Sequence, residues 1–283
     1  MLLIAESGST KCDWVLIDKS NHDNITRLRT KGLNPAILKE KALHKIIRRE
    51  TLFTNNKDKI SEIYFFGAGC NSEGSNKIIK TVLSSFFNVD KLLIAEDMMA
   101  AVYAATTKPP IVSILGTGSN CCFFDGNKIV QKTASLGYIL MDEGSGNYFG
   151  KELLKAYYYK KLPKELSISL ENRYNLSEEK VIKKLYQSKS PNKYLANFAP
   201  FIFENDDDVY IQNIIKKGVQ EFVENHILQY KDELVDHPIH FVGSIAFFSK
   251  KYILEEISKH NIKAGSFIRR PIDNLINHFL QLK

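Results

Sequence analysis

Cysteines are few in this sequence, and none stands in a metal-binding arrangement. The 283 residues include four cysteines, with no Cys-x-x-Cys pair and no histidine partner at zinc-finger spacing: Cys12, Cys70, Cys121 and Cys122. None of the seven histidines belongs to a recognisable metal or catalytic-triad pattern. We therefore interpret the cysteines as reduced thiols.

Long apolar runs and secretion signals are also missing. No stretch reaches 18 apolar residues, and Met1 to Ala5 leads straight into Glu6 without a basic leader or a cleavage-site pattern. Apolar residues make up 44% of the chain, enough to form a core. The sequence predicts a cytoplasmic, soluble protein that does not act at a membrane.

A strong excess of one charge is absent. The net charge is +7, but the 39 basic residues are offset by 32 acidic ones that are spread along the chain. This balance disfavours nucleic acid as a partner, whereas a mildly positive surface suits a protein that handles an anionic nucleotide.

The common nucleotide motifs are missing too. The chain has no Gly-x-x-x-x-Gly-Lys-Ser/Thr segment, and neither of its small-residue turns is followed immediately by a helix, as a Rossmann fingerprint requires. P-loop and NAD-binding folds are therefore poor fits.

What the chain does contain is an internal duplication. Two apolar runs, Met1 to Ala5 and Trp14 to Ile17, flank a small-residue turn. About 110 residues later the same pattern recurs, with Ile111 to Leu115 and Cys121 to Phe124 around a second turn. Gly8 and Gly118 occupy equivalent places.

The repeat continues beyond each hairpin as strand, helix, strand, helix, strand and helix. The first half has these expected elements: strand 25–30, helix 36–49, strand 63–66, helix 75–86, strand 91–95 and helix 97–106. The second half has these: strand 128–133, helix 148–159, strand 240–242, helix 246–259, strand 266–269 and helix 273–282. The fold class is therefore α/β, with two similar domains and helices that cover a mixed sheet in each.

We expect an N-terminal domain over residues 1–108 and a C-terminal domain over 109–283, because prolines at 109 and 110 interrupt any regular element. The last helix, 273–282, could instead pack on the N-terminal domain. A segment at about 160–236 has apolar residues at helical spacing and predicts a helical insertion. Whether it forms a homodimer contact is left open.

The two turns are candidate phosphate sites. Small residues let the backbone approach an anion and direct successive N–H groups at it, and the first turn, Ser7 to Lys11, adds hydroxyls and a cation. The second turn, Thr117 to Asn120, adds hydroxyls and an amide. Either turn alone would more simply be an ordinary hairpin, but their recurrence at the same place favours two facing phosphate turns.

Three acidic positions are candidates for chemistry. Asp97 follows an apolar strand and starts a helix, where it could accept a proton from an alcohol or act as a helix N-cap; Glu96 is its near competitor. Glu6 could hold a magnesium-bound water or be an exposed turn carboxylate. Asp142 lies in a glycine-rich segment that could otherwise be a solvated turn, and seven of the 15 glycines fall between positions 116 and 150.

Together these residues resemble the sugar kinase, actin and heat-shock-protein superfamily, and within it the N-acetylglucosamine kinase group that includes the BadF/BadG/BcrA/BcrD-type ATPases. The resemblance spans nearly the whole chain and rests on five motifs: Glu6 to Trp14, Gly32-Leu-Asn-Pro35, Gly116-Thr-Gly-Ser-Asn120, Asp142-Glu-Gly-Ser145 and Phe241-Val-Gly-Ser244.

The resemblance implies two duplicated actin-like (ribonuclease H-like) domains around a central cleft. It also implies a role for each matching position. Asp97 would be the general base and would face the sugar, which would also be contacted by Asn34, Gly137 and Asp142. The ATP phosphates would be bound by Gly8, Ser9, Thr10, Lys11, Gly116, Thr117, Gly118 and Ser119. The adenosine pocket would be lined by Gly243 and Ser244, and Mg²⁺ would be held through water by Glu6.

Three positions depart from the family's usual pattern. Glu6 stands where the family usually has Asp, Leu136 where the kinases often have Trp, and Ser244 where many relatives have a second glycine. The longer acid would change how a magnesium-bound water is held, and Leu136 would weaken one sugar-packing contact.

The leading hypothesis is ATP-dependent phosphorylation of an N-acetylated amino sugar, N-acetylglucosamine at its 6-hydroxyl, with ATP and Mg²⁺ as cofactors and the sugar as the small-molecule partner. The alternatives are a BadF-type ATPase that activates a radical dehydratase and a non-catalytic sugar sensor. The sequence lacks the Gly-Gly-Gln-Asp segment of the former and the terminal DNA-binding extension usual in the latter.

Overall fold

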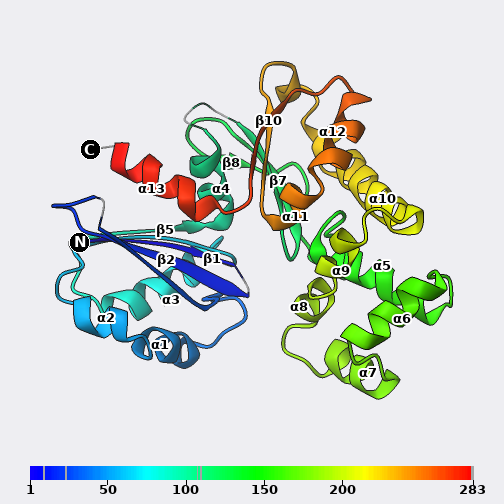
Figure 1. Cartoon of the computed structure of the whole chain (residues 1–283). Helices are drawn as coiled ribbons and strands as arrows, with labels where there is room; N and C mark the ends of the chain where they lie inside the picture. The colour runs from blue at the N-terminus through cyan, green and yellow to red at the C-terminus, as the bar shows by residue number, and fades with distance from the viewer. Residues whose placement is uncertain (9, 23, 107, 109, 282–283) are drawn as a thin grey trace. The chain divides into compact units, whose positions relative to one another are not determined.

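The computed structural model describes residues 1–8, 10–22, 24–106, 108 and 110–281, and it comprises two compact units (Figure 1). One unit is formed by Met1–Thr107 together with Arg270–Lys283, and the other by Lys108–Arg269. The chain therefore passes between the units twice, near residue 108 and again near residue 270. Each unit has its own five-stranded sheet.

The elements of the first unit follow the expected order. They are β1 (Leu2–Ser7), β2 (Lys11–Ile17), β3 (Ile25–Lys31), α1 (Glu40–Arg48), α2 (Thr51–Asn56), β4 (Glu62–Gly67), α3 (Glu73–Ser84), β5 (Lys91–Glu96), α4 (Asp97–Ala105) and α13 (Pro271–Gln281). The strand order is β3-β2-β1-β4-β5. β1 pairs antiparallel with β2 across the short turn and parallel with β4, which the chain reaches through helices.

The second unit repeats this plan and adds helices. Its elements are β6 (Ile111–Leu115), β7 (Ser119–Phe124), β8 (Ile129–Val130), α5 (Gly146–Tyr158), α6 (Lys164–Arg173), α7 (Glu178–Tyr186), α8 (Pro191–Ala196), α9 (Ala199–Glu204), α10 (Val209–Asn225), two short 3₁₀ helices (Ile227–Tyr230 and Glu233–Val235), β9 (Ile239–Val242), α11 (Ser244–Phe248), α12 (Lys250–Ser258) and β10 (Ala264–Ile268). The strand order β10-β9-β6-β7-β8 matches the first sheet strand for strand. The predicted duplicated α/β fold with a helical insertion is confirmed.

The first sheet is covered on both faces. Because side chains alternate along a strand, Phe65 of β4 points to one face of the sheet. There its ring centroid lies 6.1 Å from that of Trp14, which in turn lies 4.8 Å from that of Phe53. Tyr64, its neighbour, points to the other face and stacks on Phe279 of α13 at 4.3 Å. Burial on both faces explains why β1 and β4 are nearly continuous apolar runs.

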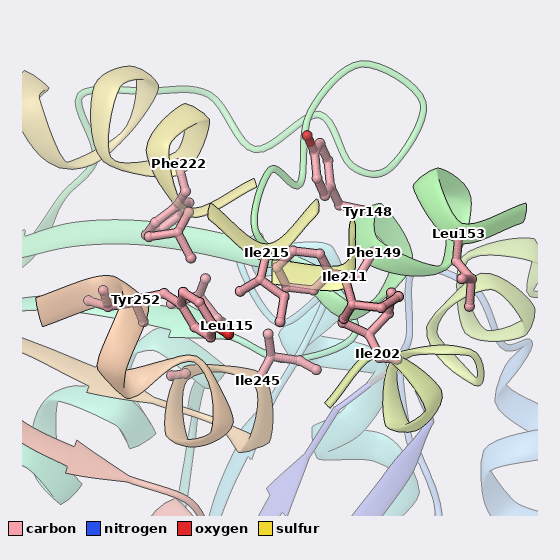
Figure 2. Close-up of a cluster of buried hydrophobic side chains, with 14 of the residues drawn as sticks. Leu115, Tyr148, Phe149, Leu153, Ile202, Ile211, Ile215, Phe222, Ile245 and Tyr252 are labelled. Carbon is pink, nitrogen blue, oxygen red and sulfur yellow. The ribbon is translucent and has the colours of Figure 1, made fainter. Parts of the chain in front are cut away.

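The second unit has a separate apolar core (Figure 2). Side chains from α5, α9, α10, α11 and α12 surround Leu115 at the end of β6. Figure 2 labels the following of them: Tyr148, Phe149, Leu153, Ile202, Ile211, Ile215, Phe222, Ile245 and Tyr252. The insertion therefore extends the core of this unit rather than forming a core of its own.

Some expected element boundaries are wrong. The strand expected at 128–133 is reduced to Ile129–Val130, and the helix expected at 36–49 starts only at Glu40. The helix expected at 246–259 is divided at Ser249 into α11 and α12, and α2 was not foreseen. Among the described residues, no helix is long and apolar enough to cross a lipid bilayer.

Candidate functional site

Three strands of the first sheet end at the same edge and bring its acidic residues together. In the parallel registers, Ser7 of β1 lies opposite Gly67 of β4, and Gly67 lies opposite Glu96 of β5. Glu6, the last residue but one of β1, therefore lies at the edge from which Asp97 follows. The carboxyl edge of a sheet is where α/β proteins place ligand-binding residues.

Glu6 has an unusual acidity. Burial raises its pKa from the ordinary 4.5 to about 7, and the negative charges of Asp97 and Asp13 add to the rise. Lys11 and Arg29 oppose it. Near neutral pH, Glu6 is thus a carboxyl group that is only partly ionised.

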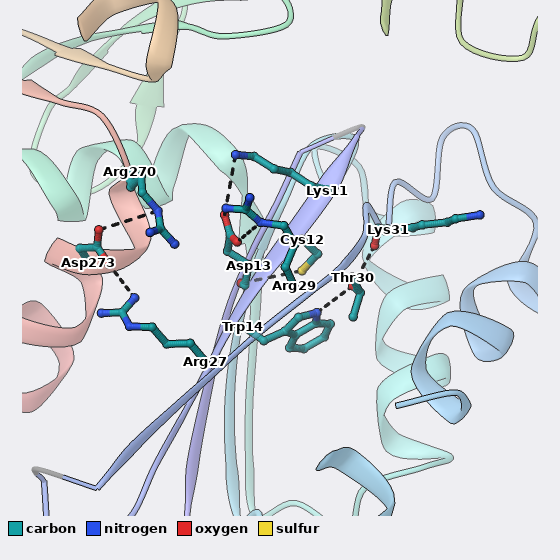
Figure 3. Close-up of polar contacts among 10 residues, drawn as sticks. All are labelled: Lys11, Cys12, Asp13, Trp14, Arg27, Arg29, Thr30, Lys31, Arg270 and Asp273. Atoms are coloured by element: carbon teal, nitrogen blue, oxygen red, sulfur yellow. Dashed lines mark hydrogen bonds and ion pairs between the residues drawn. The ribbon is translucent and has the colours of Figure 1, made fainter. Parts of the chain in front are cut away.

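Asp13 itself is held by a fixed counter-charge. The Arg29 guanidinium on β3 donates to both carboxylate oxygens of Asp13 on β2, at 2.7 and 3.2 Å, and Lys11 lies 3.9 Å away (Figure 3). Asp13 is directly opposite Glu6 in the β1–β2 register. The pair anchors the strand beside Glu6 and leaves Glu6 without a guanidinium of its own.

Asp97 is the first residue of α4, not its N-cap. The N-cap position belongs to Glu96, whose side chain makes no capping bond, so the N-cap interpretation of Asp97 is wrong. Burial raises the pKa of Asp97, while hydrogen bonds from the backbone N–H groups of Met98 and of Asp97 itself lower it. A carboxylate held this way at a helix N-terminus is fixed in direction and shifted toward basicity.

The first turn is closed by backbone bonds and tied to the next motif. The Gly8 N–H donates to the Lys11 carbonyl at 2.9 Å, and the Leu33 N–H donates to the Ser7 hydroxyl at 2.8 Å. The Thr10 hydroxyl oxygen is buried with no hydrogen-bond partner among the described residues. Ser9 lies outside them. A buried hydroxyl of this kind suits a turn that binds a polar ligand.

Asn34 lies beside this turn. Its side-chain carbonyl accepts the Ala36 N–H at 2.9 Å, and the side chain packs against Gly69, in the loop that follows β4. The Gly-Leu-Asn-Pro segment is therefore brought to the same edge of the first sheet as Glu6 and the turn.

The second turn, in the other unit, is held by the Asp142-Glu-Gly-Ser145 segment and the start of α5. The Gly146 N–H donates to the Gly116 carbonyl at 2.8 Å, and the Asn147 N–H donates to the Thr117 carbonyl at 3.0 Å. The Ser119 hydroxyl donates to the Glu143 carbonyl at 2.8 Å. The turn is consequently rigid before any ligand binds.

Asp142 is the centre of this arrangement. It adopts a φ of 73° and is 7% exposed; its two carboxylate oxygens accept the Ser119 N–H at 3.1 Å and the Asn147 side-chain amide at 2.7 Å. A Cβ on Gly118 would lie 2.8 Å from the same carboxylate, so only glycine fits there. Burial raises the pKa of Asp142, and these two hydrogen bonds lower it.

Gly243 and Ser244 follow β9, and Gly243 packs directly against the Leu115 carbonyl, next to the second turn. The Gly243 N–H donates to Ile268 at the end of β10. Gly137 lies apart from this contact, in a loop where its carbonyl accepts the N–H groups of Leu140 and Met141.

Sequence reasoning missed several residues that hold these turns. Asn147 and Arg29 were not singled out, although both bond directly to an acidic residue of the site. His226 was also missed: it is 3% exposed, and its Nε2 lies 2.9 Å from Glu143 Oε2. The available signal was proximity: Asn147 lies two residues beyond the Asp142-Glu-Gly-Ser145 motif, and Arg29 lies opposite Asp13 on the neighbouring strand. His226 gave no such signal, because it is 83 residues from its partner.

Comparison with solved structures places the chain among sugar kinases. A Porphyromonas gingivalis protein described as "Putative N-acetylglucosamine Kinase" is 32% identical, with 99% of each chain covered and a TM-score of 0.91. A Chromobacterium violaceum protein of the same description is 11% identical, with 98% of each chain covered and a TM-score of 0.74.

More distant structures share the fold alone. The ROK family glucokinase of Streptomyces griseus, solved with glucose and AMPPNP, is 12% identical, with 98% of this chain and 97% of that chain covered and a TM-score of 0.53. No protein-family profile matches the sequence, and no curated protein matches it.

Proposed function

Because this chain belongs to the N-acetylglucosamine kinase family, and is thus an ATP-dependent sugar kinase, we propose that it phosphorylates an N-acetylated amino sugar. The acceptor is N-acetylglucosamine, and the phosphoryl group goes to its 6-hydroxyl. The observation that carries the proposal is Asp97, a carboxylate at the carboxyl edge of the first sheet whose pKa is raised by burial. No other described residue of α4 offers a carboxylate.

Asp97 is the general base. It takes the proton of the attacking hydroxyl as the oxygen bonds to the terminal phosphorus of ATP and the bond to ADP breaks. A pKa above the ordinary value makes it a better proton acceptor, and its position at the N-terminus of α4 keeps it oriented. A sugar hydroxyl is therefore activated only when it lies within hydrogen-bond reach of the Asp97 carboxylate.

The two turns bind the ATP phosphates. Gly8, Thr10 and Lys11 supply a backbone approach, the unpartnered hydroxyl and a cation, and Ser9, which lies outside the described residues, is expected to act with them. Gly116, Thr117, Gly118 and Ser119 supply the second turn, which is already held in place by Asp142. Gly243 and Ser244, packed beside it, line the adenosine pocket.

Magnesium is the expected ion of such a transfer, because it neutralises charge on the phosphates. Glu6 fits a role in holding a magnesium-bound water: it is a carboxylate at the same sheet edge as Thr10 and Lys11. When its carboxyl is deprotonated it can accept hydrogen bonds from water.

The sugar would be held by Asn34, Gly137 and Asp142. Asn34 is fixed by its bond to the Ala36 N–H. Both Asp142 oxygens already accept a protein hydrogen bond, but a carboxylate oxygen can accept a second. Asp142 can therefore hold the second turn and contact the sugar at the same time.

The dehydratase-activating alternative is not favoured by any contact. All four cysteines are buried, Cys12, Cys70, Cys121 and Cys122, whereas a cluster shared by two subunits requires cysteines at a surface. Burial also raises the pKa of Cys70 to about 12, so its thiol is not reactive.

The test compares Asp97→Asn with Glu96→Gln. We expect Asp97→Asn to bind AMPPNP as the wild type does but to lose ADP release with N-acetylglucosamine by about 10²- to 10⁴-fold, the usual contribution of a general base. Glu96→Gln, one residue away, should retain most activity. Near wild-type turnover by Asp97→Asn would contradict the assignment of the base.

Acceptor identity is tested separately with the wild-type protein. ADP release is measured with N-acetylglucosamine, other amino sugars, N-acetylmuramic acid, glucose and no acceptor. The highest rate should occur with N-acetylglucosamine. Rates equal to the no-acceptor control throughout would overturn the kinase proposal.

A further inference from the structure

Helix α10 of the insertion lies directly behind the Asp142-Glu-Gly-Ser145 segment. Gly144 has a φ of 66°, and a Cβ there would lie 3.1 Å from both the Gly218 carbonyl and the Phe222 Cβ of α10. The segment that braces the second turn is therefore in close contact with the insertion, with no room for a side chain between them.

His226 adds a directed bond to this contact. It is the C-cap residue of α10, and its ring stacks on Phe222 with centroids 5.0 Å apart and planes 23° apart. Its Nε2 donates to Glu143 Oε2 at 2.9 Å, so that a buried donor meets a carboxylate. Among the described residues, no other hydrogen bond reaches the Glu143 carboxylate.

The bond is continuous with the phosphate turn. The backbone carbonyl of Glu143 accepts the Ser119 hydroxyl at 2.8 Å, and the neighbouring Asp142 carboxylate accepts the Ser119 N–H at 3.1 Å. His226 is thus connected to Ser119 of the turn through a single residue, Glu143, which forms a hydrogen bond with each of them. A shift of Glu143 away from α10 would carry both contacts of Ser119 with it.

We propose that His226 is a positioning residue for ATP: through Glu143 it holds the second turn in the shape that receives the phosphates. This inference rests on the proposed function of that turn. It assigns the insertion a task in nucleotide binding. Binding to a turn held in advance loses less conformational entropy, so loss of the bond weakens ATP more than it weakens the sugar.

The experiment measures binding of AMPPNP and of N-acetylglucosamine by calorimetry, with the melting temperature as a control. His226→Phe keeps the stack on Phe222 and removes the bond to Glu143; His226→Gln restores a donor. We expect His226→Phe to weaken AMPPNP binding about tenfold, or about 1.4 kcal/mol, and to weaken sugar binding less. His226→Gln should recover most of that loss.

The matched control is Tyr158→Phe, which removes a hydrogen bond of similar length, to the Leu176 carbonyl at 2.8 Å, in the same unit but away from the turn. It should lower the melting temperature and leave AMPPNP binding unchanged. Glu143→Ala should reproduce the AMPPNP loss of His226→Phe, and the double variant should lose no more than either, since both remove one bond.

The outcomes separate the two claims. If the wild type binds no AMPPNP, the proposed function and this inference both fail. If the wild type binds it and folded His226→Phe and Glu143→Ala bind it equally well, only the inference fails. Additive losses in the double variant would likewise overturn it, because they would mean that the two side chains act independently.

Discussion

At the scale of single residues, Glu6 and Asp97 at the edge of the first sheet both have a raised pKa. Glu6 has two negative neighbours, Asp97 and Asp13, while the guanidinium of Arg29 is engaged by Asp13. The result is a carboxyl whose charged form is disfavoured by folding.

Glu6→Gln should therefore change the pH dependence of stability. The folded pKa of about 7 exceeds the ordinary 4.5, so between these values the folded state binds more protons than the unfolded state. The contribution of Glu6 to the free energy of unfolding is full below pH 4.5 and is lost as pH rises through 7. We expect the variant to be more stable than wild type at pH 8 by about 2 kcal/mol, and the difference to shrink at pH 5.

Urea unfolding at pH 5 and pH 8 in magnesium-free buffer measures this difference. Glu73→Gln, which alters an exposed carboxylate on α3, is the control and should show no comparable change between the two pH values. An equal effect of both substitutions on the free energy of unfolding at both pH values would show that folding does not raise the pKa of Glu6.

The residue scale is also where the sequence predicted least. Glu6, Asp97 and the two turns could be identified because they lie next to strand ends, which are visible as apolar runs. The partners that fix them could not, because the bonds Asp13 to Arg29 and Glu143 to His226 join residues 16 and 83 positions apart. The N-cap interpretation of Asp97 failed because a one-residue difference in where α4 begins decides it.

At the scale of secondary elements, α13 completes the first unit. Its Phe279 stacks on Tyr64 and Phe66, and Asn274 donates to the Ala104 carbonyl at the end of α4 at 2.9 Å. Arg27 on β3 pairs with Asp273 at 2.6 Å (Figure 3). The helix thus supports α4, whose first residue is Asp97.

Phe279→Ala should destabilise the first unit by about 3 kcal/mol, the usual cost of removing a buried aromatic ring. Phe279 is 7% exposed and contacts aromatic rings from β4 and α4. The variant's thermal unfolding should begin at a lower temperature. Asn277→Ala, which changes an exposed position on the same helix, should leave it unchanged; equal effects would mean that α13 does not pack as described.

Element order was predictable because periodicity and turn residues are local signals, and the insertion was identified as helical for the same reason. Element ends were less predictable. The strand expected at 128–133 shrank to β8 because only Ile129 and Val130 pair with β7. The division between α11 and α12 at Ser249 has no strong breaker in the sequence.

At the scale of the whole molecule, two separate cores are connected by two chain crossings. The core of the first unit surrounds Trp14 and Phe65, and that of the second surrounds Phe149 and Phe222. Because α13 belongs to the first unit although it follows β10 of the second, we expect α13 to unfold together with the first sheet.

Hydrogen exchange under increasing urea tests this expectation. Amides of α13 should become exposed with those of β1 and β4, at the same apparent free energy, and β10 should exchange with β6 and β9. Exchange of α13 together with β10 would contradict it. The measurement uses the intact wild-type chain, so no fragment needs to fold alone.

The packing of α13 has a consequence for synthesis on the ribosome. Residues 108–269 form a contiguous unit that can fold as soon as they emerge, whereas the first unit also needs residues 270–283. Until then Tyr64 and Phe66 lack their partner Phe279. The half of the protein that is translated first is therefore completed after the half that follows it, and until then the aromatic face of its sheet is uncovered.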